Sequence, residues 1–298
     1  MHRILALALA VSAALALPTS SAQEATELAS PQETDERNPL LFVMEDDDSR
    51  VYLLGSIHLL DAESYPLPAD VEAAYQDADA LAFEVDMRDL ASVQAAVMSR
   101  AQYTNGGTLQ EAIGAEAFAT LDSLMTPFGM PAIALNSFEP WAVQLTLAGL
   151  GAQALGYNPQ NGVDMHFTTR AQSDEKPIFA LETAESQMDI FDGTPEEAQV
   201  AQLTEMLAEW EEQAAVFEAL VSAWESGDEM QIVALMNDLP EESHNALLRD
   251  RNAVWVPQIE AMLAGTDDVL VVVGAGHLAG DVSVVAMLRE KGYTLTRQ

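Results

Sequence analysis

Two apolar segments near opposite ends of the chain finish with the same short pattern. Residues 51–60 read VYLLGSIHLL and residues 269–278 read VLVVVGAGHL, so each apolar run leads to a glycine that precedes a histidine by three positions. Short apolar runs rich in valine and leucine, closed by glycine, predict buried strands. The chain must therefore bring two distant segments into its core to bury both.

Further strand patterns alternate with helical ones along the chain. Residues 40–43 and 51–54 predict a hairpin around the turn EDDDSR, and two apolar runs end in glutamate, LAFE at Glu84 and IFALE at Glu182. Alternation of strands with helices is typical of the α/β class. We predict a mixed central sheet built from two related halves, flanked by helices, with helical insertions at about residues 90–170 and 194–240.

The beginning of the chain has the pattern of an export signal. Arg3 precedes an apolar stretch at residues 4–17, and the small residues of Ser-Ser-Ala end at Ala22. This pattern predicts a signal peptide at residues 1–22, because the stretch is shorter than the about 20 apolar residues that span a bilayer. We expect a flexible leader at residues 23–38, a single domain at residues 39–298, a periplasmic or secreted location and no stable membrane insertion after cleavage.

Charge and cysteine content narrow the function classes. The formal net charge is −36, and acidic residues are spread through the sequence. Such a field repels nucleic acid and anionic membrane surfaces, so we expect neither as a partner. The chain has no cysteine, which excludes a thiolate metal site, a cysteine nucleophile and a lipoprotein anchor.

Four polar residues follow predicted strands, in the order His58, Glu84, Glu182 and His277. Because ligands of α/β proteins bind at the carboxyl ends of strands, these residues are expected to meet in one crevice. Two histidines with one or two carboxylates suit a zinc, manganese or cobalt ion. Without a metal the same groups serve as general acid and base. From spacing alone, a structural role for both histidines stays equally open.

Other polar residues have two interpretations each. Arg251 either binds a substrate carboxylate or developing oxyanion, or forms an ion pair on a helix. Asp61 and Asp86 either orient an imidazole or cap the next helix. For Asp164 and His166, at a predicted helix start, a helix cap and a surface or internally bonded histidine are favoured.

Five segments together resemble the TraB/GumN family, which includes the TIKI proteases. They are LLGSIHLL, LAFEVD, ALETAESQ, RNAVW and VVVGAGHLAGDVSVVAMLREKGYTL, and the resemblance runs from about residue 39 to residue 297. The family looks related to the erythromycin esterase and ChaN-like group. The resemblance implies an α/β fold and metal-dependent hydrolysis, with a peptide or another small molecule as substrate.

The resemblance also implies roles for individual residues. His58, Glu84 and His277 match the family's metal ligands or acid–base set, Glu182 is a further ligand or base, and the pair Arg251-Asn252 binds substrate. The first motif reads Gly-Ser-Ile-His where Gly-Thr-x-His is commoner, and serine keeps the hydroxyl. The alternatives are a non-catalytic protein that binds a metal, haem or polysaccharide-related ligand, and an ester hydrolase of the erythromycin esterase type.

Overall fold

The sheet is built from segments that are far apart in the sequence. The computed structural model describes residues 36–237 and 239–298, so the predicted signal peptide and most of the predicted leader lie outside the described residues. Six strands pair in the order β4-β3-β5-β2-β1-β6. Their bounds are Leu41–Glu45 (β1), Arg50–Ser56 (β2), Ala80–Phe83 (β3), Ile178–Ala180 (β4), Val269–Gly274 (β5) and Thr296–Arg297 (β6).

The two strands that carry Gly-x-x-His are direct neighbours in the middle of the sheet. β2 and β5 are parallel, with Gly55 opposite Val273 and Ser56 opposite Gly274. β3 and β4 extend the parallel part, whereas β1 pairs antiparallel with both β2 and β6. The sheet is therefore mixed, as predicted, and both histidine segments leave it at the same edge. That its two halves are related stays a prediction.

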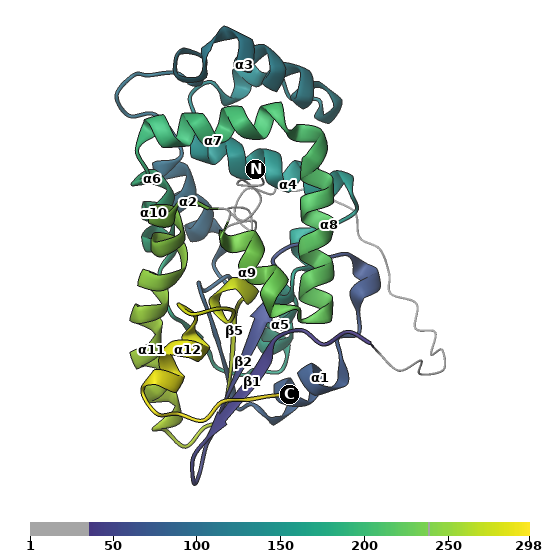
Figure 1. Cartoon of the computed structure of the whole chain (residues 1–298), viewed down its shortest axis with the longest axis vertical. Helices are drawn as coiled ribbons and strands as arrows, with labels where there is room; N and C mark the ends of the chain where they lie inside the picture. Colours follow the sequence, from purple (N-terminus) through teal and green to yellow (C-terminus); the bar gives the residue numbers. More distant parts are fainter. Residues whose placement is uncertain (1–35, 238) are drawn as a thin grey trace.

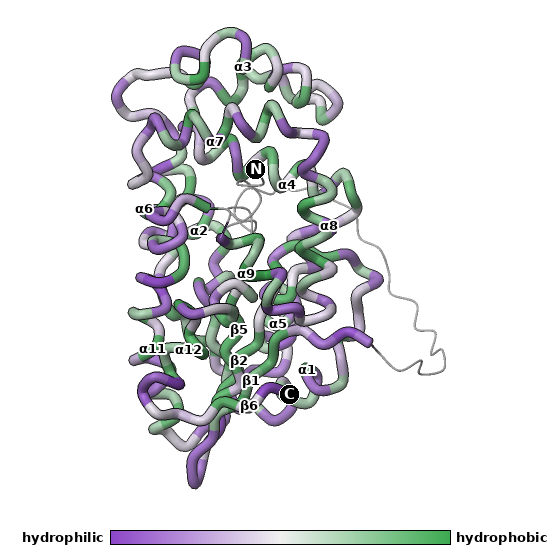
Figure 2. Tube along the Cα trace, in the orientation of Figure 1, coloured by the Kyte–Doolittle hydropathy of each residue, from purple (hydrophilic) through white to green (hydrophobic). Residues whose placement is uncertain are grey.

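The central strands are apolar because they are covered on both faces. Every residue of β5 is buried, and all of β3 is buried as well. Figure 2 shows the strands as the most continuous hydrophobic segment of the lower part of the molecule. Parallel strands with helices on both faces have this near-continuous apolar composition.

Helices lie on both sides of the sheet in Figure 1, with α11 and α12 on one side and α1 and α5 on the other. Short 3-10 turns and a five-residue π-helix, Asn245–Arg249, link several elements. The α-helix bounds are Ala69–Asp77 (α1), Leu90–Arg100 (α2), Leu109–Met125 (α3), Pro140–Ala154 (α4), Val163–Ser173 (α5), Ala184–Asp192 (α6), Glu196–Ala208 (α7), Trp210–Ser226 (α8), Glu229–Asn237 (α9), Glu241–His244 (α10), Asp250–Leu263 (α11) and Val284–Glu290 (α12).

Part of the predicted helical insertions forms a layer beyond the end of the sheet. α3, α4 and α7 pack on one another there through their own apolar cluster, which includes Leu121, Val143 and Leu203. α4 is strongly apolar, and most of its residues are buried. Among the described residues, no helix combines the length and hydrophobicity needed to cross a membrane.

Candidate functional site

The sheet register brings both predicted glutamates to the edge where β2 and β5 end. Glu84 follows β3, and its Oε1 accepts a hydrogen bond from the backbone N–H of Gly274 at 2.7 Å. The backbone N–H of Glu182 donates to the carbonyl of Glu84 at 2.9 Å, which extends the pairing of β3 with β4 by two residues. The two carboxylates are thus placed by backbone pairing next to the end of β5.

His58 is held by Asp164, a residue whose predicted role was a helix cap. The Nδ1 atom of His58 lies 2.7 Å from Asp164 Oδ2, and Ser56 Oγ donates to Asp164 Oδ1 at 2.9 Å. The cap prediction is wrong, because the N-cap position of α5 is Gly162 and Asp164 lies inside the first turn. An ionised carboxylate only accepts, so Nδ1 of His58 carries a hydrogen.

A glycine makes this contact between distant segments possible. The backbone N–H of Val163 donates to the carbonyl of Ile57 at 3.0 Å, so α5 begins against the loop that carries His58. A methyl carbon on Gly162 would lie 2.2 Å from the backbone oxygen of His58, far inside contact distance. Only glycine allows this approach, which brings Asp164 to His58.

His277 is held in one tautomer by Asn252. The Nδ2 atom of Asn252 donates to the carbonyl of Val282 at 2.8 Å, and Asn252 Oδ1 lies 2.6 Å from His277 Nδ1. The oxygen of Asn252 must accept, so Nδ1 of His277 carries the hydrogen, and its Nε2 has a lone pair that can accept a hydrogen bond. Arg251 Nη1 donates to this Nε2 at 3.0 Å.

Arg251 joins the two glutamates into one buried network. Its Nη2 donates to Glu84 Oε2 at 2.5 Å and to Glu182 Oε1 at 2.6 Å, and its Nη1 donates to the carbonyl of Leu247. The side chains of Arg251 and Glu84 are each 5% exposed. Gln187 Nε2 adds hydrogen bonds to both carboxylates, at 3.1 Å each. Arg251 forms ion pairs, but with buried glutamates at the strand ends and not on a helix face, and its position beside both carboxylates also suits charge stabilisation.

The two histidines have opposite electrostatic environments. Burial alone would lower the pKa of His58, but the carboxylates of Asp164 and Glu84 outweigh it and raise the pKa to about 9. Burial and the neighbouring Arg251 lower the pKa of His277 to about 3. Burial would raise the pKa of Glu84, but Arg251, His277 and His58 lower it to about 2. At neutral pH, His58 is therefore a cation, His277 is neutral and Glu84 is ionised.

Three predicted site residues converge on the space beside Gly274. A methyl carbon on Gly274 would lie 3.3 Å from Glu84 Oε1, 3.7 Å from His277 Cδ2 and 3.9 Å from His58 Nε2. The Nε2 atom of His58 is buried and has no hydrogen-bond partner among the described residues. A proton donor, a carboxylate and an imidazole therefore face one small volume.

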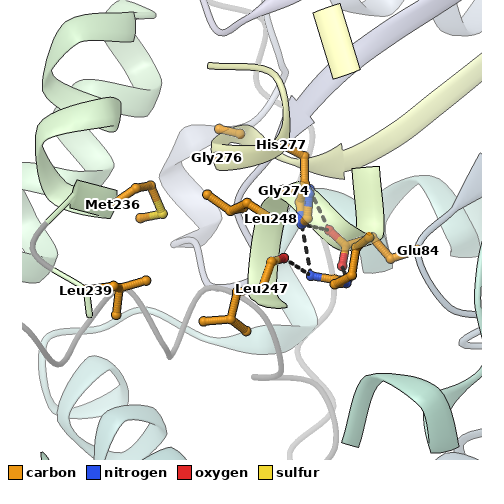
Figure 3. A pocket seen from close by; sticks show the side chains of 10 residues that line it. Glu84, Met236, Leu239, Leu247, Leu248, Gly274, Gly276 and His277 are labelled. Carbon is orange, nitrogen blue, oxygen red and sulfur yellow. Dashed lines mark hydrogen bonds and ion pairs between the residues drawn. The ribbon is translucent and has the colours of Figure 1, made fainter. Parts of the chain in front are cut away.

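A small cavity, here called the inner cavity, adjoins this space. Glu84, Arg251 and His277 line its polar side, and its volume is about 30 Å³, enough for a water molecule. Figure 3 shows apolar side chains opposite Glu84 and His277, namely Met236, Leu239, Leu247 and Leu248. They come from α9, the π-helix and the segment between them.

The predicted metal ligands do not form a metal site in this arrangement. Two imidazoles and a carboxylate are ligands that zinc, manganese or cobalt accept. However, Arg251 occupies His277 Nε2 and Glu84 Oε2, so a divalent cation there would lie against a guanidinium. Within residues 36–237 and 239–298, no group of three or more His, Asp or Glu side chains is placed to hold a metal ion. The metal stays a prediction.

The other predicted residues lie outside this cluster or behind it. Asp61 caps a short 3-10 helix by accepting from the backbone N–H of Ser64, and Asp86 pairs with Arg88. Asn252 is fully buried behind His277, so its contacts hold the imidazole, and substrate binding by Asn252 stays a prediction.

Three residues that support the cluster had no site role predicted from the sequence: Ser56, Asp164 and Gln187. Ser56 and Asp164 act behind His58, whereas Gln187 reaches both carboxylates from α6. The only signal for Ser56 was its position inside the Gly-Ser-Ile-His motif. For Gln187 there was a weak signal, its position near the start of a predicted helix that follows Glu182. A side chain in the first turn of that helix can point back towards the end of the strand.

Comparison with known proteins identifies the family of this chain. The sequence matches the TraB/PrgY/gumN family over residues 40–297. It is 27% identical over 239 residues to "Uncharacterized protein YbaP" of Escherichia coli (strain K12), covering 80% of this chain and 87% of that protein, and equally similar to the protein of the same name from Shigella flexneri. No solved structure matches. The family match spans nearly all of the described residues and includes every residue of the cluster, so this chain belongs to the TraB/PrgY/gumN family.

Proposed function

We propose that this protein is a secreted or periplasmic hydrolase that cleaves peptide bonds at the cluster of His58, Glu84, Arg251 and His277. The observation that carries the proposal is the convergence of Glu84 Oε1 and the unpartnered His58 Nε2 on the space beside Gly274. Hydrolysis requires one group that accepts a proton from water and one that donates a proton to the leaving group, and here both are held next to a water-sized cavity.

The chemistry follows from the charge states of the cluster. A water molecule in the inner cavity attacks the carbonyl carbon of the substrate, and the Glu84 carboxylate accepts the proton that this water loses. Arg251 lies beside Glu84 and stabilises negative charge that develops on the carbonyl oxygen. His58 then gives its Nε2 proton to the leaving nitrogen, so that the carbon–nitrogen bond breaks and a neutral amine departs. His277, neutral and fixed by Asn252, orients Arg251.

The test uses the chain without its predicted signal peptide, beginning at Gln23. Cleavage of a peptide mixture and of a small ester panel is measured for the unmodified protein, His58→Ala and His277→Ala, together with the bound manganese, cobalt and zinc. His166→Ala is the matched control, because His166 is a half-buried histidine of α5 that contacts Arg170 and not the cluster. Unchanged cleavage and unchanged metal content in both cluster variants would contradict the proposal. Cleavage of esters but not peptides would favour the ester hydrolase, and fractionation of producing cells tests the location.

One observation favours a second candidate, a non-catalytic binding protein. Glu84, Arg251 and His277 are almost inaccessible and satisfy one another, and the inner cavity has room for little more than water. A closed cluster of this kind suits a structural or ligand-holding role. Saturable binding of a metal ion or haem that depends on His58, without turnover of any peptide or ester, would support this candidate over the hydrolase.

A further inference from the structure

The inner cavity alone cannot accommodate a substrate. Its volume of about 30 Å³ is that of a water molecule, whereas an empty pocket that holds benzene measures roughly 150 Å³. If the cluster acts on a larger molecule, the bulk of that molecule must lie in a neighbouring space.

A second cavity, here called the side cavity, adjoins the inner one. Its volume is about 230 Å³, and it lies among α6, α7 and the segment that leads into the π-helix. Leu247 lines both cavities, and the consecutive residues Leu239 and Pro240 line the inner and the side cavity respectively. Leu247 therefore lies between the two spaces.

The lining of the side cavity indicates what it can hold. Trp141 and Phe191 stack on each other, with ring centroids 5.8 Å apart and planes inclined by 21°, and both are buried. Half-buried polar residues, Thr194, Gln202 and Ser243, complete the lining. An aromatic wall with a polar rim suits a large apolar group whose ends carry hydrogen-bonding atoms.

Charge excludes acidic occupants. Among the described residues that line the side cavity, Glu242 is the only charged one, and the whole chain carries a net charge of −36. A carboxylate or phosphate entering here would meet a negative field without a cation to pair with. An uncharged aromatic or aliphatic group meets no such penalty.

The wall between the cavities is connected to the cluster. Leu247 belongs to the π-helix Asn245–Arg249, a rare element that occurs often at functional sites. The carbonyl of Leu247 accepts a hydrogen bond from Arg251 Nη1 at 3.0 Å, and the same nitrogen donates to His277. A group that pushes on Leu247 from the side cavity thus acts one hydrogen bond away from the residues of the cluster.

We propose that the side cavity binds a large, uncharged apolar or aromatic side chain of the substrate, next to the bond that is cleaved. This inference rests on the proposed hydrolase function. It predicts a preference for a substrate with phenylalanine over the same substrate with alanine at the position beside the cleaved bond.

The experiment fills the cavity from two of the helices that line it. Ala198→Trp on α7 and Ser243→Phe on α10 occupy it, whereas Ala201→Trp on the exposed side of α7 adds the same bulk outside it. The kcat/KM values for N-acetyl-phenylalanine and N-acetyl-alanine p-nitrophenyl esters and for matching peptides are compared. We expect the unmodified protein and the control to prefer phenylalanine at least tenfold. Both filled variants should lose this preference while their turnover of the alanine substrates stays within about twofold of the unmodified protein.

A binding measurement separates failure of this inference from failure of the hydrolase proposal. N-acetyl-phenylalaninamide is titrated into the unmodified protein, His58→Ala and Ala198→Trp, with ligand-observed NMR as the signal. Binding that survives His58→Ala and disappears in Ala198→Trp, with no ester or peptide cleaved, would support the side cavity and contradict the hydrolase. Cleavage with an unchanged phenylalanine preference in both filled variants, or absence of probe binding to the unmodified protein, would overturn the side-cavity inference.

Discussion

His58 and Asp164 form a hydrogen-bonded pair across 106 positions of sequence, with Nδ1 of the imidazole 2.7 Å from the carboxylate. The other ring nitrogen, Nε2, is buried and has no partner among the described residues. A histidine fixed at one nitrogen and unengaged at the other is oriented for proton transfer from the second one. Asp164 is therefore a positioning residue for His58.

Replacing Asp164 by asparagine should impair hydrolysis without removing His58. We expect Asp164→Asn to lower kcat/KM by about 100-fold, the scale of general acid catalysis. The alkaline limb of the pH profile should also move to lower pH, because Asp164 helps to raise the pKa of His58. Asp174→Asn, which removes the carboxylate beside Tyr75 at the other end of α5, is the control. A reduced rate with an unmoved alkaline limb would contradict proton donation by His58.

The raised pKa of His58 also predicts how stability depends on pH. Its pKa is 6.5 ordinarily and about 9 in the folded protein, so the folded state binds the proton more tightly. The stability that the protonated His58 adds to the folded state is fully present below pH 6.5 and is lost as pH rises through 9. The shift corresponds to about 3 kcal/mol of unfolding free energy. Urea unfolding at pH 6 and pH 10 should show a loss of this order that is absent in His58→Gln, and equal losses in both proteins would contradict the assignment.

The position of the cluster was predictable from the sequence because local patterns determine it. The apolar runs that end at Gly55 and Gly274 bury themselves as neighbouring parallel strands, and residues just beyond parallel strands emerge at one edge. Glu84 follows a buried strand in the same way. The placement of His58, Glu84 and His277 around one space therefore needed only strand periodicity and the rule for strand ends.

The hydrogen bonds within the cluster were not predictable in the same way. The contact of Asp164 with His58 depends on the close approach of α5 at Gly162. The hydrophobic pattern of the sequence does not predict which loop the start of a helix will contact. Likewise, the sequence left Arg251 open as a substrate ligand or as half of an ion pair, and only the folded chain shows that the guanidinium contacts Glu84, Glu182 and His277. Such contacts arise from tertiary packing between positions far apart in the chain.

Removing the guanidinium should strongly destabilise the fold. Arg251→Met keeps much of the side chain's length but removes the guanidinium that pairs with the buried carboxylates of Glu84 and Glu182. We expect a loss of about 3–5 kcal/mol in unfolding free energy at pH 7. Burial raises the pKa of Glu84, but Arg251, His277 and His58 together lower it from 4.5 to about 2, so the stabilising contribution of the ionised carboxylate is present above pH 4.5 and is lost as pH falls towards 2. The difference in unfolding free energy between the variant and the unmodified protein, measured by denaturant titration, should therefore shrink over that pH range. A difference that stays constant with pH would contradict the ion-pair account.

The same arginine should oppose the predicted metal. Manganese, cobalt or zinc held by His58, Glu84 and His277 would need Nε2 of His277, which accepts from Arg251, and would lie close to the guanidinium that also holds Oε2 of Glu84. A divalent cation is also repelled by a guanidinium at close range, and removing that positive charge relieves the repulsion. We expect Arg251→Met, at a temperature where it stays folded, to bind these ions at least tenfold more tightly than the unmodified protein in calorimetric titrations. Adding His58→Ala to this variant should abolish the gain, whereas adding His166→Ala should preserve it. Equal affinity with and without Arg251 would mean that any metal binds elsewhere.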